Sequence, residues 1–315
     1  MKIAFQCNTL GLRGVELAVF NFARYNEEIL GNESIVISTQ PHVYNLSHPV
    51  VMDKFRKRFP LFLYDKFNEV ERTLDDNKVD VFYSQKGGVN DGIVSPGRKT
   101  VIHAVFQQNQ PHGDVYAFIS KWLGNRYNAP FVPYTVTLPE INENLRTELN
   151  IPKDVIVFGR HGGAETFDIP FVHNVVRRIA EQRKDIYFLF LNTNRFTDAS
   201  LTNVIYLDGT ENLDYKAKFI NTCDAMLHAR YAGESFGLAV GEFSIRNKPV
   251  ITLLNGSRDC AHIEMLGDKG IYYNNENEVF NIINDFKPDD GKDWNAYRDY
   301  NPENIMNIFK NVFLS

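Results

Sequence analysis

Cysteine is scarce in this chain of 315 residues, and the three that it has, Cys7, Cys223 and Cys260, lie far apart. An odd number of cysteines without a C-x-x-C pair indicates neither a disulfide framework nor a zinc site. Such usage is typical of a reducing compartment, so we expect a cytoplasmic protein.

Long apolar runs are also missing. The longest, such as IVIS and YFLFL, are of strand length and fall far short of the roughly 20 apolar residues that a membrane-spanning helix needs. The N-terminal MKIAFQCNTLG carries one lysine but neither the apolar stretch nor the cleavage site of a signal peptide. The sequence therefore predicts neither a membrane span nor a secretion signal.

No block of one charge sign is present. Lys and Arg number 34, Asp and Glu number 39, and the formal net charge is −5. A mildly acidic chain without a basic segment is not expected to bind nucleic acid as its main partner. The hydrophobic share of 43% is ordinary for a globular protein, and the length allows one large core or two of roughly 150 residues each.

Several catalytic motifs are absent. We find no H-E-x-x-H, no Walker A loop, no G-x-S-x-G and no EF-hand. The glycines beside predicted strands do not make G-x-G-x-x-G, which excludes a nicotinamide fingerprint. An Asp-x-Asp pair that would hold a divalent cation is missing too. We therefore expect neither a metal nor a cofactor.

Short apolar segments alternate with amphipathic ones along the chain, which is typical of α/β layers. Strands are predicted at 2–7, 34–38, 79–84, 100–106, 115–120, 154–159, 185–191, 203–208, 223–229, 249–253 and 270–273. Helices are predicted at 15–30, 120–127, 169–183, 214–222, 237–247, 276–286 and 302–315. Residues 40–78 show no comparable pattern.

Prolines indicate a junction in the middle of the chain. Those of residues 128–153 are Pro130, Pro133, Pro139 and Pro152. Such a density interrupts a helix and a central strand alike. We therefore predict an N-terminal domain at 1–150, a C-terminal domain at 151–298, and a terminal helix at 299–315 that packs back on the N-terminal domain.

The segment HARYAGESFGLAVGEFSIRNKPVIT, residues 228–252, joins a strand end, a loop of small residues and a helix start near Gly237. Unpaired backbone N–H groups and the positive end of the helix dipole meet at such a start and favour a phosphate or a sugar hydroxyl. Two carboxylates, Glu234 and Glu242, bracket this start. In the alternative interpretation, Glu234 only complements the helix dipole and Glu242 is a solvated helix residue.

The same segment resembles the signature of the retaining family-4 glycosyltransferases of the GT-B fold. That family has Glu-x-Phe-Gly-Leu after a strand, a second Glu eight residues after the first, and a strand that opens with Pro-Val. The matching residues here are Glu234, Phe236, Gly237, Leu238, Glu242, Pro249 and Val250. The resemblance implies an α/β protein with two Rossmann-like, doubly wound parallel-sheet domains that face a cleft.

By similarity, this segment would bind the sugar donor. The implied donor-binding residues are Glu234, Ser235, Phe236, Gly237 and Leu238 for the sugar and its phosphates, and Glu242 for the ribose hydroxyls of the nucleotide. One departure is Asn247, which stands before Lys248 where the family usually has a small residue. Because Asn tolerates the left-handed conformation of a helix end, the departure puts little in doubt.

A second match is VIVFGRHGG, which ends at Gly163. The family carries strand–Gly–Arg here, and a guanidinium is suited to a diphosphate. Arg160 is therefore the candidate for that contact, with a salt-bridged surface Arg as the alternative. The family usually adds a Lys about five residues on, where this chain has Glu165. The amides of Gly162 and Gly163, or the side chain of Arg230, are candidates to replace it.

The N-terminal NTLGLRGVELAVFNFAR resembles the Gly-x-Glu loop that leads into the first helix of the family. The resemblance implies that Gly14, two residues before Glu16, approaches the donor phosphates, with Arg13 as an extra contact. The alternative is that Gly11 and Gly14 only serve a turn.

His103 in TVIHAVF stands at the place of the family's strand-end His, although the customary acidic neighbour is Ala104 here. The resemblance implies that His103 faces the donor sugar and supports the reaction. A lone His among apolar residues is equally typical of a satisfied core residue. His112 and His161 are weaker site candidates.

The resemblance implies a metal-independent hexosyltransferase that uses a nucleotide-diphosphate sugar, retains configuration, and acts through Arg160, Glu234 and His103. The acceptor would be a glycan or a lipid-linked or protein-linked sugar, and a peripheral membrane contact is compatible with it. Two alternatives remain. One is a GT-B-fold epimerase or phosphorylase. The other is a non-catalytic sugar-binding protein that kept the fold, which is conceivable because Glu165 stands where the family usually has Lys.

Overall fold

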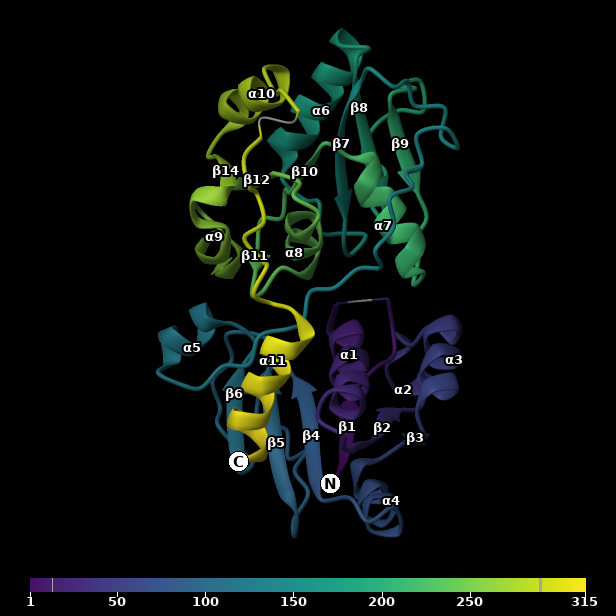
Figure 1. Ribbon diagram of the computed structural model, residues 1–315, viewed down its shortest axis with the longest axis vertical. Coiled ribbons are helices and arrows are strands. Elements are labelled where there is room, and N and C mark those ends of the chain that lie inside the picture. The colour runs from purple at the N-terminus through teal and green to yellow at the C-terminus, as the bar shows by residue number, and fades with distance from the viewer. Residues whose placement is uncertain (13, 289–290) are drawn as a thin grey trace. The chain divides into compact units, whose positions relative to one another are not determined.

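Parallel strands built from the apolar segments form the centre of each half of the chain in the computed structural model, which describes residues 1–12, 14–288 and 291–315 (Figure 1). The chain divides into two units. Unit 1 comprises Met1–Thr135 and Asp299–Ser315, and unit 2 comprises Val136–Arg298.

The described residues of unit 1 form a six-stranded parallel sheet in the order β3-β2-β1-β4-β5-β6. Its strands are β1 (Lys2–Cys7), β2 (Glu33–Thr39), β3 (Leu61–Tyr64), β4 (Val81–Lys86), β5 (Lys99–Ala104) and β6 (Val115–Phe118). Its helices are α1 (Gly14–Glu28), α2 (Pro41–Tyr44), α3 (Pro49–Arg58), α4 (Val70–Asp76), α5 (Lys121–Tyr127) and α11 (Pro302–Phe309). All six residues of β4 are buried, as expected for a parallel sheet with both faces covered.

Unit 2 repeats this plan as far as the structure describes it, with six parallel strands in the order β14-β12-β10-β7-β8-β9. The strands are β7 (Ile156–His161), β8 (Ile186–Leu191), β9 (Val204–Leu207), β10 (Ala225–Leu227), β12 (Val250–Leu253) and β14 (Gly270–Tyr273). The helices are α6 (Pro170–Gln182), α7 (Leu213–Thr222), α8 (Leu238–Ile245), α9 (Ala261–Leu266) and α10 (Glu276–Asn284). A separate short parallel pair is formed by β11 (Gly233–Glu234) with β13 (Asp259–Cys260).

Both sheets thus have the doubly wound order, in which the chain moves outward from the first strand and then returns to its other side. In unit 1 the reversal falls between β1 and β4, and in unit 2 it falls between β7 and β10. The prediction of two doubly wound parallel sheets is confirmed. Residues 40–78, where the sequence indicated nothing, contain α2, α3, α4 and the four-residue β3.

The terminal helix α11 belongs to unit 1. The ring of its Phe309 lies 5.2 Å from that of Phe22 in α1 and 5.7 Å from that of Tyr83 in β4, measured between centroids. Aromatic pairs at such spacing add to the burial of apolar surface. The helix therefore covers this face of the first sheet, as its apolar side suggested.

Residues 136–150, which the sequence placed with the N-terminal domain, make their contacts with unit 2. The backbone N–H of Leu145 donates to Thr222 Oγ1 at 2.8 Å, and Asn221 Nδ2 donates to the Ile141 carbonyl at 2.7 Å. Hydrogen bonds to α7 thus hold this proline-containing segment before the first strand of unit 2 begins. None of the helices formed by the described residues combines the length and apolarity that a bilayer crossing requires.

Gly159 in β7 gives a test of the packing in unit 2. A Cβ at this position would lie 2.1 Å from Cys223 Sγ, and both residues are buried. We expect Gly159→Ala to lower the free energy of unfolding by about 2 kcal/mol, because overpacking a core displaces its neighbours. Urea unfolding followed by circular dichroism measures the change.

Removal of the opposing sulfur should relieve this clash. The double variant Gly159→Ala/Cys223→Ala should recover at least half of the loss, measured against Cys223→Ala alone. If the second substitution recovers nothing, the limit is set by Cys223 Cβ and Phe243 Cζ, which would lie 3.0 and 3.3 Å from the new Cβ, rather than by the thiol.

Candidate active site

The carboxyl ends of β7 and β10 lie side by side in unit 2, because Ala225 pairs with Phe158 and Met226 with Gly159. This is the point where the strand order reverses, and ligands of doubly wound sheets bind at such a point. Arg160 and His161 end β7, and the loop that begins at His228 follows β10. The two sequence matches of the second half therefore meet at one edge of one sheet.

Arg160 is 3% exposed, and its guanidinium is held by four acceptors. Nη1 donates to the Asn192 carbonyl at 3.1 Å and to Thr193 Oγ1 at 2.6 Å. Nη2 donates to the Gly163 carbonyl at 2.8 Å and to Thr166 Oγ1 at 2.5 Å. All four acceptors are neutral. Burial lowers the pKa of Arg160 to about 10, which leaves it charged at neutral pH.

The glycine loop after β7 folds around this guanidinium. Gly162 has φ +155°, and a Cβ there would lie 2.9 Å from Arg160 Nη2, so the close approach requires glycine. Gly163 turns its carbonyl, not its amide, toward the guanidinium. Glu165, which stands where the family usually has Lys, is exposed.

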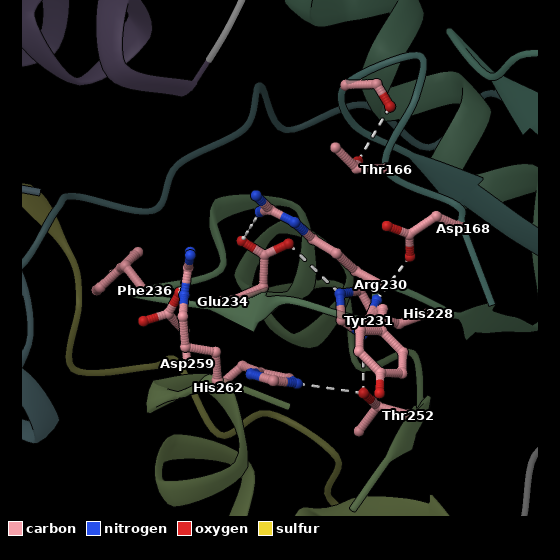
Figure 2. Close-up of polar contacts among 12 residues, drawn as sticks. Thr166, Asp168, His228, Arg230, Tyr231, Glu234, Phe236, Thr252, Asp259 and His262 are labelled. Atoms are coloured by element: carbon pink, nitrogen blue, oxygen red, sulfur yellow. Dashed lines mark hydrogen bonds and ion pairs between the residues drawn. The ribbon is translucent and has the colours of Figure 1, made fainter. Parts of the chain in front are cut away.

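A second loop, between β10 and β11, is tied to the first. The backbone N–H of Tyr231 donates to Asp168 Oδ1 at 2.6 Å, and that of Asp168 donates to the Ala229 carbonyl at 2.9 Å. Arg230 Nη1 then donates to Glu234 Oε2 at 2.8 Å, and the Arg230 and Glu234 side chains point toward one another in Figure 2. Their exposed fractions, 28% and 20%, leave both within reach of a ligand.

Glu234 also lies beside a histidine, since its Oε1 is 3.4 Å from His228 Nε2. Burial acts to raise the pKa of Glu234, but the hydrogen bond from His228 and the charge of Arg230 outweigh it and lower the pKa to about 2. The site therefore holds an ionised carboxylate, which can only accept hydrogen bonds.

The helix start that the sequence predicted begins next to this carboxylate. Gly237 caps α8 with φ +88°, and a Cβ there would lie 3.3 Å from His262 Cβ. The Tyr297 hydroxyl donates to the Phe236 carbonyl at 3.0 Å and fixes the approach to the helix. Ser235 and Leu238 are partly exposed on either side.

Glu242, the second carboxylate of the motif, is 2% exposed. Its Oε1 lies 3.0 Å from Lys216 Nζ, and its Oε2 lies 3.0 Å from His161 Nε2. Burial acts to raise the pKa of Glu242, but the charge of Lys216 and the contact with His161 lower it to about 2. Glu242 is therefore a buried ion-pair partner and not a solvated helix residue.

His103 and Gly14 belong to unit 1. His103 is fully buried, with Nδ1 2.6 Å from the Tyr83 hydroxyl and Nε2 2.8 Å from the Val132 carbonyl. Burial lowers its pKa to about 3. Both ring nitrogens are thus occupied by the protein, as in the alternative of a satisfied core residue.

Gly14 is exposed at the first residue of α1. Glu16, two residues on, is buried and accepts a hydrogen bond from Thr9 Oγ1 at 2.7 Å. Glu16 therefore holds Thr9 of the preceding segment against α1. Arg13 lies outside the described residues.

Sequence reasoning missed several polar side chains that complete the site, namely Thr166, Thr193, Lys216, Thr252 and His262. None carries a local signal, because each acts through a partner that is brought close only by the fold. Within the part of the chain that the structure describes, no group of three or more His, Cys, Asp or Glu side chains is arranged to hold a metal ion.

Comparisons with known proteins give likeness of structure only. No family model matches the sequence, and no curated protein does. HepE of Anabaena in complex with UDP-glucose superposes with a TM-score of 0.69 at 15% identity, covering 99% of this chain and 95% of that one. A glycosyltransferase from Rickettsia africae gives a TM-score of 0.64 at 13% identity, covering 99% and 94%.

The fold is GT-B. A third solved structure, MnaA of S. aureus with UDP, gives a TM-score of 0.61 at 13% identity and covers 100% of this chain and 98% of that one. Each likeness extends over nearly the whole chain and so includes both sheets. At such identities the likeness establishes the fold, and the chemistry must be argued from the site.

Glu242 gives a test of the buried charges. The pKa of this carboxylate is about 2 in the folded protein and about 4.5 in the unfolded chain. Its ionised form therefore stabilises the protein fully above pH 4.5, and this contribution is lost as the pH falls to 2. Glu242→Gln should lower the free energy of unfolding by about 3 kcal/mol at pH 7, because Lys216 loses its partner. The deficit should shrink as the pH falls toward 2.

Urea unfolding at pH 7, 5, 4 and 3 measures this dependence. The control is Glu33→Gln, which removes an exposed ion pair with Lys2 and should cost less than about 1 kcal/mol. A deficit that stays constant with pH would show that Glu242 is not held ionised by its neighbours.

Proposed function

We propose that the protein is a glycosyltransferase, which moves a hexosyl group from a nucleotide-diphosphate sugar to an acceptor hydroxyl with retention of configuration and without a metal. The observation that carries the proposal is the pair of sites at the carboxyl ends of β7 and β10. A buried guanidinium without a carboxylate in its hydrogen bonds and an ionised Glu234 beside a helix start suit a diphosphate and a sugar, respectively.

In the proposed complex, unit 2 binds the donor. Arg160 supplies positive charge to the diphosphate, and the amides at Phe236–Leu238 add the dipole of the helix start. Glu234 accepts a hydrogen bond from a sugar hydroxyl. Glu242 is assigned to the ribose, although it must share its oxygens with Lys216 and His161.

The reaction breaks the bond between the anomeric carbon and the diphosphate oxygen and forms a bond from the same carbon to the acceptor oxygen on the same face. The acceptor proton passes to the departing phosphate. Negative charge grows on the diphosphate during this step, so Arg160 and the helix amides lower the barrier electrostatically. His103 receives no role here, because both its nitrogens are occupied in the core of unit 1.

The acceptor is proposed to bind to unit 1 and to be a glycan or a lipid-linked or protein-linked sugar. This part rests on the resemblance of the motifs, in which the first domain takes the acceptor. A cytoplasmic location and a peripheral membrane contact belong to the same proposal.

A second candidate is an epimerase of the same fold. It is favoured by the likeness to a structure from Listeria monocytogenes that is named for UDP-N-acetylglucosamine 2-epimerase, with a TM-score of 0.62 at 13% identity. Product analysis separates the two. Freed nucleotide together with a glycosylated acceptor supports transfer, whereas a nucleotide-sugar isomer without any acceptor requirement supports epimerisation.

Ligand binding is the first test. UDP and UDP-glucose should raise the melting temperature by several degrees, since a ligand at about 100 times its dissociation constant adds about 2.7 kcal/mol of stability. GDP, ADP, TDP and their sugars form the comparison panel. If no nucleotide or nucleotide-sugar shifts the melting temperature, the chain is a binding or scaffold protein that kept the fold.

The role of Arg160 is tested by Arg160→Lys, which keeps the positive charge but loses the planar guanidinium that donates to four acceptors. The release of UDP from UDP-glucose should fall about 10²-fold, as for the loss of an oxyanion donor. Arg183→Lys is the matched control, because Arg183 lies at the end of α6 and pairs with Asp185. Unchanged turnover in a folded Arg160→Lys variant would remove Arg160 from the site.

A further inference from the structure

A continuous chain of polar contacts leads away from Glu234 into the interior of unit 2. Glu234 Oε1 faces His228 Nε2 at 3.4 Å, and His228 Nδ1 lies 2.8 Å from Thr252 Oγ1. Thr252 Oγ1 in turn lies 3.2 Å from His262 Nε2 (Figure 2). His228, Thr252 and His262 are exposed by 5%, 0% and 1%, so bulk water has little access to these side chains.

The position of the first hydrogen follows from Glu234. Because an ionised carboxylate offers no hydrogen, the facing nitrogen, His228 Nε2, must carry one. Two arrangements then remain. A neutral His228 has a lone pair on Nδ1 and accepts the hydrogen of the Thr252 hydroxyl. A protonated His228 instead donates from Nδ1 to Thr252 Oγ1.

The hydrogen bonds of His262, at the far end of this series of contacts, distinguish the two arrangements. If Thr252 donates to His228, its oxygen accepts from His262 Nε2–H, and neutral His262 keeps a bare lone pair on Nδ1. If Thr252 donates to His262 Nε2, the hydrogen of His262 must sit on Nδ1. That nitrogen is buried beside the backbone of Glu234, but it does not meet the distance and angle of a hydrogen bond with any described residue. An orphaned N–H is rarer in folded proteins than an under-used acceptor, so the first arrangement is favoured.

We propose that Thr252 and His262 are positioning residues that hold His228 as the neutral Nε2–H tautomer and thereby fix the Glu234 carboxylate for a hydroxyl of the donor sugar. Each residue then donates a hydrogen bond to the next: His262 to Thr252, Thr252 to His228, and His228 to Glu234. Arg230 donates to the other oxygen of the same carboxylate. Both Glu234 oxygens are thus oriented before a ligand arrives.

The sugar contact in this inference rests on the proposed function, whereas the hydrogen positions do not. They can be measured in the unliganded protein by two-bond ¹H–¹⁵N correlation of the histidine rings, with His228→Gln and His262→Gln used for assignment. His103 is an internal reference, because its Nε2 faces a carbonyl and must carry the hydrogen.

We expect His228 and His262 to give the Nε2–H pattern at neutral pH. A protonated His228 would overturn the proposal. So would a His262 that carries its hydrogen on Nδ1, toward the backbone of Glu234.

The consequence for binding is tested with Thr252→Val and Thr252→Ser, titrated with UDP and with UDP-glucose. Thr252→Val should weaken UDP-glucose about fivefold to tenfold and change UDP less than twofold, because Glu234 is assigned to the sugar alone. Thr252→Ser keeps the hydroxyl and should restore wild-type affinity. Thr100→Val, which removes a buried strand hydroxyl bonded to Ser95 in unit 1, is the control and should bind both ligands like wild type.

An equal loss of affinity for UDP and UDP-glucose in Thr252→Val would mean a general disturbance of unit 2 and would contradict the positioning role. Wild-type affinity for both ligands would contradict it as well. If UDP-glucose does not bind the wild-type protein, the proposed function fails, while the ring spectra still decide the hydrogen positions.

Discussion

A buried charge must be stabilised by hydrogen-bond partners or opposite charges inside the protein, and unit 2 is organised around this constraint. Arg160, Glu242 and the carboxylate of Glu234 all lie at or near the carboxyl edge of one sheet with little access to water. Removing an unmatched charge from water costs several kcal/mol. The loops after β7, β8 and β10 therefore fold so that hydroxyls, carbonyls and opposite charges surround these groups.

Glu242 and Arg160 are stabilised by different kinds of partner, and this difference is relevant to function. Glu242 is matched by Lys216 and His161, which makes it a structural as well as a candidate ligand-binding residue. Arg160 donates its hydrogen bonds only to neutral acceptors, while Glu234 lies close enough to stabilise its charge without a direct ion pair. A guanidinium that is not bound to a carboxylate is suited to act on a diphosphate.

The doubly wound order explains why these residues meet. In a parallel sheet every carboxyl end lies at the same edge, and the reversal of strand order separates the loops on either side of it. Arg160 and Glu234 are far apart in sequence, but Arg160 lies at the end of β7 and Glu234 lies in the segment that follows the neighbouring strand β10. The structural neighbours share this fold at 13% to 15% identity, so the arrangement depends on the pattern of elements more than on particular side chains.

The doubly wound order was implied by the resemblance of the motifs. Local pattern along the sequence was sufficient for most of the strands and helices, for the α/β class, and for the helix start at Gly237 beside Glu234. Each of these is encoded by residues near to one another in the chain. Tertiary structure alone decided that His103 is enclosed by Tyr83 and Val132 and that His262 reaches Glu234 through Thr252 and His228. Such contacts arise when separate strands and helices pack together, and the energy of burying a polar group depends on partners that local sequence does not reveal.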